Sequence, residues 1–128
     1  QYDLNIKVPE NVELLGCIYN QKSLAEYYSM ADVTLLTSRK ETYSMICAES
    51  LCCGTPVVGF KAGAPEQISI PEFSCFVQFG DVPALLYNTR GMIEKGLDKE
   101  KIANIAAEIY SKEKMVSDYI GVYNDTKD

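Results

Sequence analysis

Three short apolar segments constrain the fold of this chain more than any other feature of its sequence. They span residues 11–16, 31–36 and 56–60, and they are weighted towards apolar side chains without regular polar alternation. Such runs are typical of strands that are buried on both faces of a parallel sheet. A fourth short strand is predicted at residues 75–78. The sequence therefore predicts a sheet whose strands are mostly parallel.

Helical patterns fill the intervals between these strands. Residues 23–30 carry apolar side chains at the spacing of an amphipathic helix, and residues 45–53 form a mostly apolar helix that ends at Gly54. Alternating strands and helices form right-handed crossovers, which place helices on both faces of the sheet. The predicted fold is α/β, a Rossmann-like three-layer domain with a mostly parallel sheet flanked by helices. Further helices are predicted at residues 82–95, 99–110 and 112–123, separated by Gly96 and Ser111.

Size and charge narrow the class of protein. We expect residues 1–128 to form a single domain, because 128 residues with 47% apolar side chains suffice for one hydrophobic core. The net charge of −6 argues against nucleic acid as a partner, since its phosphates are bound by clusters of Lys and Arg. No apolar run approaches the roughly 18 residues of a spanning helix, and no export signal precedes the first strand. We therefore expect a cytoplasmic location.

The chain has five cysteines and no histidine. An odd number of cysteines without C-x-x-C spacing indicates neither a disulfide framework nor a zinc site. We therefore expect no bound metal and no cofactor, and we interpret the cysteines as small buried residues in a reducing compartment. Without histidine, any chemistry falls to carboxylates, hydroxyls and backbone groups. The cysteines are Cys17, Cys47, Cys52, Cys53 and Cys75.

Residues 37–45 follow the strand at 31–36 and open the apolar helix at 45–53. In parallel sheets ligands bind at the carboxyl ends of the strands, so this segment lies where a ligand is expected. Ser44 or Thr42 is predicted to cap the helix. The N–H groups of its first turn, with their partial positive charge, favour a phosphate or a diphosphate. Such a site would let an acidic domain hold an anion.

Two glutamates flank this predicted anion site. Glu49 stands in a helix that we expect to be buried nearly all round, so its carboxylate needs a partner. That partner is either a nearby Lys, Arg or backbone N–H, or a pair of vicinal hydroxyls such as a ribose supplies. Glu41 precedes it with seven residues between them, a path that can bring both carboxylates to one side of the helix N-terminus.

Several motifs occur in a fixed order along the chain. Glu41 and Glu49 are followed by the run 53–58, Cys-Gly-Thr-Pro-Val-Val, and then by Pro65-Glu66, while residues 11–16 and 31–33 precede them. With this order and spacing, nearly the whole chain resembles the retaining glycosyltransferases of the GT-B fold. More narrowly, it is similar to glycosyltransferase family 4, also named glycosyl transferases group 1. The resemblance implies that the chain is the C-terminal, donor-binding half of such an enzyme.

The resemblance also implies roles for individual residues. Glu41, the residue assigned to the catalytic site, would contact hydroxyls of the donor sugar, and Glu49 would bind the nucleotide ribose. Backbone amides of the turn would meet the sugar and the diphosphate, and the segment after residues 11–16 would border the base. Family members usually read Glu-Gly-Phe-Gly in the turn, so the side chains of Thr42 and Ser44 either cap the helix or crowd the sugar. The implied nucleotide-sugar-binding residues are Glu49, Tyr43, Ser44, Met45, Thr42, Cys17 and Ile18.

By this resemblance the parent enzyme, of the hexosyltransferase type, moves a sugar from a UDP- or GDP-type donor to a glycan, lipid or other acceptor. Polysaccharide or glycoconjugate biosynthesis is the implied process, with peripheral membrane association of the parent. The acceptor would bind mainly to an N-terminal domain. The family's Arg and Lys that neutralise the diphosphate would lie in a strand-helix unit before Gln1, so we expect the isolated chain to be inactive. Arg39 and Lys40 are either a solvated pair or a substitute clamp.

Other functions are weighed against this one. The main alternative is a non-catalytic, Rossmann-like regulatory or assembly module that has lost donor binding. A dehydrogenase would need G-x-G-x-x-G, which the glycines do not form, and a receiver domain would need its Asp at the carboxyl end of a strand, whereas Asp32 lies at a strand start. We interpret the helical tyrosines as packing residues of the core. They are Tyr27, Tyr28, Tyr87, Tyr110, Tyr119 and Tyr123.

Overall fold

A parallel sheet forms the centre of the protein. The computed structural model describes residues 7–125, and within them the sheet has three strands in the order β1-β2-β3. Strand β2 pairs in parallel with both neighbours, so that Val57 lies opposite Thr34 on one side and Ser74 on the other. The predicted parallel α/β fold is thereby confirmed. The strands are β1 (Thr34–Leu36), β2 (Val57–Phe60) and β3 (Ser74–Val77).

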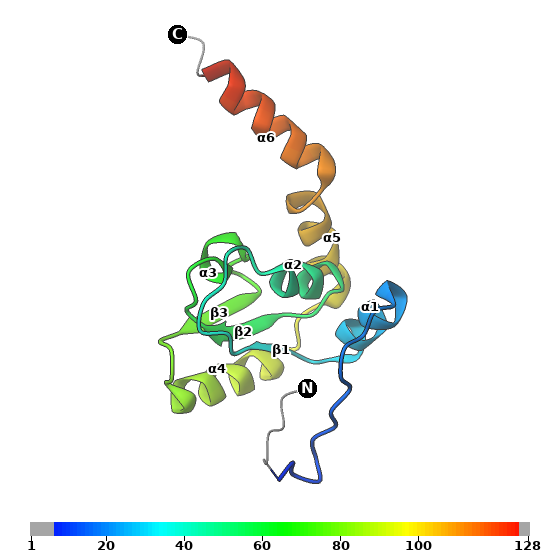
Figure 1. Ribbon diagram of the computed structural model, residues 1–128, viewed down its shortest axis with the longest axis vertical. Coiled ribbons are helices and arrows are strands. Elements are labelled where there is room, and N and C mark those ends of the chain that lie inside the picture. The colour runs from blue at the N-terminus through cyan, green and yellow to red at the C-terminus, as the bar shows by residue number, and fades with distance from the viewer. Residues whose placement is uncertain (1–6, 126–128) are drawn as a thin grey trace.

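Helices connect the strands and follow the last one (Figure 1). The five that the sequence predicts are all present, and a short helix, α3, adds to them. Most begin at a side-chain cap: Asn20 Oδ1 accepts from Ser23 N at 3.0 Å, and Asp81 Oδ1 accepts from Ala84 N at 2.9 Å. The helices are α1 (Gln21–Met30), α2 (Met45–Cys52), α3 (Pro65–Ile68), α4 (Val82–Glu94), α5 (Lys99–Ile109) and α6 (Lys112–Asp125).

Adjacent residues of β2 point into two separate apolar clusters. Val57 packs with Leu51 and Ile102 on the face covered by α2 and α5, and all three side chains are fully buried. Val58 packs on the opposite face, where α4 contributes Leu85 and Met92. Figure 1 shows α2 and α5 on one side of the sheet and α4 on the other. The domain therefore has three layers, with β2 buried on both faces.

The strand predicted at residues 11–16 is absent from the structure. This segment leads into α1 without pairing with β1, β2 or β3 (Figure 1). The side chain of Leu14 is 75% exposed. A run of apolar residues gives a segment the tendency to form a strand, but its N–H and C=O groups still need a neighbouring backbone. No segment among residues 7–125 supplies that neighbour.

The predicted burial of the cysteines is largely wrong. Only Cys47 is buried, while Cys17 and Cys52 are exposed and Cys53 and Cys75 are half-buried. All five are free thiols. The reason is that helix α2 turns only one side to the core, so Cys47 and Cys52 fall on different sides of it.

The predicted role of the tyrosines in packing is also mostly wrong. Tyr110 alone packs against the larger apolar cluster, and its hydroxyl donates to Ile68 O at 2.7 Å. Tyr28 is half-buried between α1 and α2. The other four are exposed, because they lie on the outer sides of α1 and α4 or on α6, a helix without buried residues. These four are Tyr27, Tyr87, Tyr119 and Tyr123.

Helix α6 extends away from the layered part of the domain (Figure 1). Neither it nor any other helix within residues 7–125 is long and apolar enough to cross a membrane.

Two glycines with the same backbone conformation test how tightly α2 is packed against α5. Gly54 has a φ of +81° and Gly80 a φ of +84°, but a Cβ atom on Gly54 would lie 2.5 Å from Lys99 O, whereas one on Gly80 meets nothing within 4 Å. Gly80→Ala should cost only the left-handed strain, about 1 kcal/mol of unfolding free energy. Gly54→Ala should cost roughly 2–4 kcal/mol, since the helices must also separate. Urea denaturation measures both, and equal losses would contradict the packing.

Candidate functional site

The loop after β1 is fixed to the loop after β2 at the carboxyl edge of the sheet. Glu41 and Gly63 form an isolated parallel bridge, in which Glu41 N donates to Ala62 O at 3.0 Å. Gly63 has a φ of +106°, a conformation that favours glycine. The bridge continues the pairing of β1 with β2 beyond the strands, so the backbone of Glu41 has a defined place at the edge where ligands of parallel sheets bind.

Glu66 holds the loop after β2 from the start of α3. Its two carboxylate oxygens accept from Ala62 N at 3.1 Å and from Gly63 N at 3.0 Å. Burial raises the pKa of the Glu66 carboxyl, but the backbone N–H donors around it outweigh burial and bring the pKa below its usual range. Glu66 therefore supports the bridge to Glu41 from the far side.

Helix α2 begins at an unusual residue. Ser44 has a φ of 68° and a ψ of 72°, and it is the one residue other than glycine with a positive φ in the described chain. The predicted cap is wrong: Ser44 holds the N-cap position without a side-chain cap bond, and Thr42 is exposed three residues before the first residue of the helix. A capping serine needs extended backbone angles to reach the first-turn N–H groups, and Ser44 does not have them. The N–H groups of Met45 and Ile46 lack helical acceptors, as in any first turn.

Glu49 lies one helical turn beyond Met45 and faces α1. Its side chain is half-buried, and its Oε2 accepts from the Tyr28 hydroxyl at 3.4 Å. Helix α2 is not buried all round as predicted, since Met45 and Ile46 are exposed and only one face enters the core. Among the described residues no ion pair includes Glu49. Its second carboxylate oxygen therefore has capacity for another donor.

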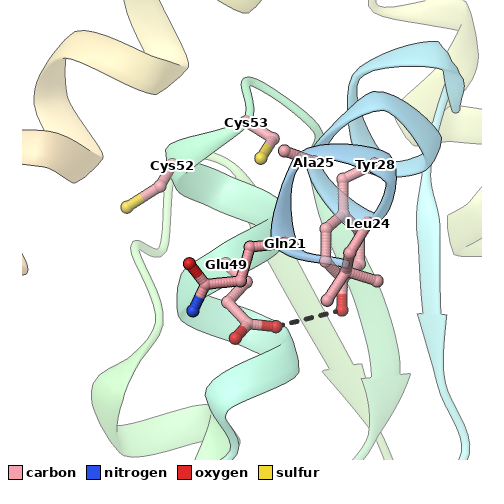
Figure 2. Close-up of a pocket in the computed structure, with 7 residues that line it drawn as sticks. All are labelled: Gln21, Leu24, Ala25, Tyr28, Glu49, Cys52 and Cys53. Atoms are coloured by element: carbon pink, nitrogen blue, oxygen red, sulfur yellow. Dashed lines mark hydrogen bonds between the residues drawn. The ribbon is translucent and has the colours of Figure 1, made fainter. Parts of the chain in front are cut away.

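A cavity of about 230 Å³ lies between α1 and α2 (Figure 2). The carboxylate of Glu49 and the hydroxyl of Tyr28 point towards each other in it, and the side chain of Gln21 extends from the first turn of α1 beside them. Most of the remaining wall is apolar. Such a combination of apolar walls and a few convergent polar groups is typical of a small-molecule site. The lining residues are Gln21, Leu24, Ala25, Tyr28, Glu49, Cys52 and Cys53.

Hydrogen bonds fix both walls of this cavity to the sheet. The Thr55 hydroxyl donates to Tyr28 O at 2.6 Å, which attaches the end of α1 to the loop before β2. The Ser50 hydroxyl donates to Thr34 Oγ1 at 2.8 Å, which attaches α2 to β1. Burial raises the pKa of the Tyr28 phenol to about 12, with a smaller contribution from the negative charge of Glu49. Tyr28 therefore stays a neutral hydrogen-bond donor over the physiological range of pH.

The structure brings some predicted site residues together and leaves others apart. Glu41, Tyr43, Ser44 and Met45 follow one another at the start of α2, and Glu49 reaches the cavity from the same helix. Cys17 and Ile18 precede α1 and do not line the cavity. Tyr28 and Gln21 do line it. From the sequence alone, Tyr28 is interpreted as a packing residue of the core, and Gln21 lies before the helix predicted at residues 23–30. The one signal for Tyr28 is that the lone carboxylate of α2 needed a donor from elsewhere.

The two cationic residues of the loop after β1 lie on the protein surface. Arg39 and Lys40 are both exposed, and the guanidinium of Arg39 lies 5.7 Å from the ring centre of Phe79. That ring in turn meets Phe60 edge to face at 5.2 Å. Arg39 thus has an aromatic partner in the segment after β3, on the carboxyl side of the sheet.

Comparison with known proteins shows the family of this chain. A family model described as "Glycosyl transferases group 1" matches residues 1–95. The chain belongs to this family. N-acetyl-alpha-D-glucosaminyl L-malate synthase of Bacillus anthracis is 30% identical over 94% of this chain and 32% of its own length. D-inositol 3-phosphate glycosyltransferase of Acidothermus cellulolyticus is 30% identical over 80% of this chain and 23% of its own length.

A shorter match has higher identity. D-inositol 3-phosphate glycosyltransferase of Thermomonospora curvata is 49% identical over 34% of this chain and 10% of its own length. The chain thus spans about a third or less of the length of these group 1 relatives.

The contact between Tyr28 and Glu49 can be tested by titration. Glu49→Gln should lower the Tyr28 pKa from about 12 but leave it above 10, because burial is the largest cause of the shift and the charge of Glu49 the next. NMR of ring-labelled tyrosine measures this pKa. Because the folded pKa exceeds that of the unfolded chain, stability should fall as pH rises from about 10 to about 12, and Tyr28→Phe should lessen that fall.

Glu26→Gln is the matched control. Glu26 lies on α1, the helix that carries Tyr28, where its carboxylate is exposed and lies 4.0 Å from the Lys22 ammonium. This substitution should leave the Tyr28 pKa almost unchanged. If both variants moved that pKa equally, the contact with Glu49 would be refuted.

Proposed function

We propose that this chain provides the nucleotide-sugar-binding site of a group 1 glycosyltransferase, with the donor held between the start of α2 and the cavity beside α1. One observation carries the proposal. Helix α2 has unpaired hydrogen-bond donors at its start, beside Ser44, and one turn later it carries the carboxylate of Glu49, which lines a small cavity. A nucleoside diphosphate presents the complementary groups, since it has an anionic diphosphate on one side and two vicinal ribose hydroxyls on the other. Family membership favours the same ligand.

The diphosphate is assigned to the start of α2. The first-turn N–H groups of Met45 and Ile46 and the positive end of the helix dipole favour an anion there. The chain as a whole is acidic, with a net charge of −6, so attraction must come from groups in the immediate neighbourhood of the phosphates. Exposed backbone around Thr42 and Tyr43 leaves this end of the helix open to a ligand.

The ribose is assigned to the cavity between α1 and α2. The Glu49 carboxylate can accept from both vicinal hydroxyls, and the hydrogen bond from Tyr28 holds it in position to do so. The cavity volume of about 230 Å³ suits one sugar ring and not a whole nucleotide sugar. The base would then extend towards Cys17 and Ile18, in the segment that precedes α1. Glu41, at the carboxyl edge of the sheet, is proposed to contact the hydroxyls of the donor sugar.

The transfer reaction is proposed for a protein longer than this chain. The relatives are named D-inositol 3-phosphate glycosyltransferase and N-acetyl-alpha-D-glucosaminyl L-malate synthase, and this chain covers a third or less of their length. We propose that the whole protein transfers a sugar from a UDP- or GDP-type donor with retention of configuration, without a metal or a cofactor. Its acceptor would bind mainly outside residues 1–128. The isolated chain is then expected to bind donors without transferring sugar.

Replacing Glu49 tests the proposed ribose contact. In isothermal titration calorimetry, the chain should bind UDP or GDP, and Glu49→Ala should weaken that binding at least about tenfold, because bonds to a charged group are lost. The control is Glu94→Ala, which removes an exposed carboxylate from α4 on the opposite face of the sheet and should change nothing.

Equal affinities of the Glu49→Ala variant and the unmodified chain would refute the ribose contact. If the unmodified chain bound none of UDP, GDP, ADP and CDP at millimolar concentration, the non-catalytic module would become the better account.

A further inference from the structure

Ser44 combines two unfavourable features, and no contact among residues 7–125 relieves either of them. The backbone of Ser44 is in the left-handed conformation, and only 5% of the surface of this residue is exposed. Its Oγ is the one buried side-chain oxygen or nitrogen without a hydrogen-bond partner among the described residues. A left-handed serine and an unpaired buried hydroxyl each destabilise a fold. Their coincidence in one residue indicates that Ser44 meets a partner absent from the free chain.

The position of Ser44 indicates what that partner is. As the N-cap residue of α2, it brings its side chain to the end of the helix where the N–H groups of Met45 and Ile46 lack acceptors. The hydroxyl oxygen of a capping serine ordinarily accepts a hydrogen bond from such an N–H group, so that the hydroxyl and the N–H group are both paired. The left-handed backbone of Ser44 prevents this, so a hydroxyl and the first-turn N–H groups remain unpaired together. The N–H groups can only donate and the hydroxyl can donate as well, so an anion with several oxygens can satisfy them together.

We propose that the Ser44 hydroxyl donates a hydrogen bond to a phosphate oxygen of the ligand bound at the start of α2. The inference rests on the proposed function and makes it more specific, since it assigns part of the anion affinity to a side chain and not to the backbone alone. Ser44 lies between two exposed residues, Tyr43 and Met45, so the ligand can reach this turn. Rotation about the Cα–Cβ bond of Ser44 then brings its hydroxyl to the phosphate.

Two substitutions separate the hydroxyl from the backbone. Ser44→Ala removes the hydroxyl and keeps a Cβ in the left-handed conformation, whereas Ser44→Gly removes the hydroxyl and the strain together and keeps that conformation accessible. Both should bind UDP and inorganic pyrophosphate about five- to tenfold more weakly than the unmodified chain. Ser44→Gly should at the same time melt roughly 2–6 °C higher. A variant that binds the ligand more weakly but melts at a higher temperature is expected where the original residue serves ligand binding at a cost in stability.

Calorimetric titration with UDP and with inorganic pyrophosphate, followed by thermal melts, tests the inference. Ser117→Ala, which removes an exposed hydroxyl from α6, is the control and should bind like the unmodified chain. If the unmodified chain binds both probes and the two Ser44 variants bind them within twofold as well, the role of Ser44 is refuted and the proposed function stands. If the unmodified chain binds neither probe and also binds none of GDP, ADP and CDP, both proposals fail.

Discussion

Burial of β2 on both faces is the constraint on which the other parts of the structure depend. Because Val57 and Val58 point into separate apolar clusters, helices must cover both sides of the sheet. Because β2 pairs in parallel with β1 and β3, all three strands end at one edge. The bridge between Glu41 and Gly63 lies just beyond that edge, and α2 begins four residues after Glu41. The site is thus a consequence of how the sheet is buried.

Helix α2 connects this core to the chemistry of the site. One face supplies Cys47 and Leu51 to the apolar cluster and anchors the helix, while Ser50 bonds it to β1. The start of the helix and the position of Glu49 are thereby fixed, although both lie outside the core. The fold tolerates the strain at Ser44 and the half-buried carboxylate of Glu49 because the packed face holds the helix in place.

The sequence alone predicts the layers, since buried strands and helix caps such as Asp81 depend on local patterns. It fails where the outcome depends on distant neighbours. Residues 11–16 look like a strand, but no segment of the described residues 7–125 pairs with them. A serine before a helix looks like a cap, but the backbone of Ser44 is left-handed and its side chain makes no cap bond. The spacing of Glu41 and Glu49 predicts that both carboxylates flank the start of α2, and this stays a prediction. The contact of Glu49 with Tyr28 joins residues 21 apart in sequence, so no local pattern could predict it.

The central claim is that α2 presents a nucleoside diphosphate site at its start and along its α1-facing side. Backbone amide shifts in NMR spectra of the labelled chain, recorded during titration with UDP and GDP, test it most directly. The account predicts that the largest shifts fall on Ser44, Met45 and Glu49, with smaller ones at Tyr28. Shifts confined to the far side of the sheet, at the cavity between β3 and α4 that Tyr87 and Arg90 line, would contradict it.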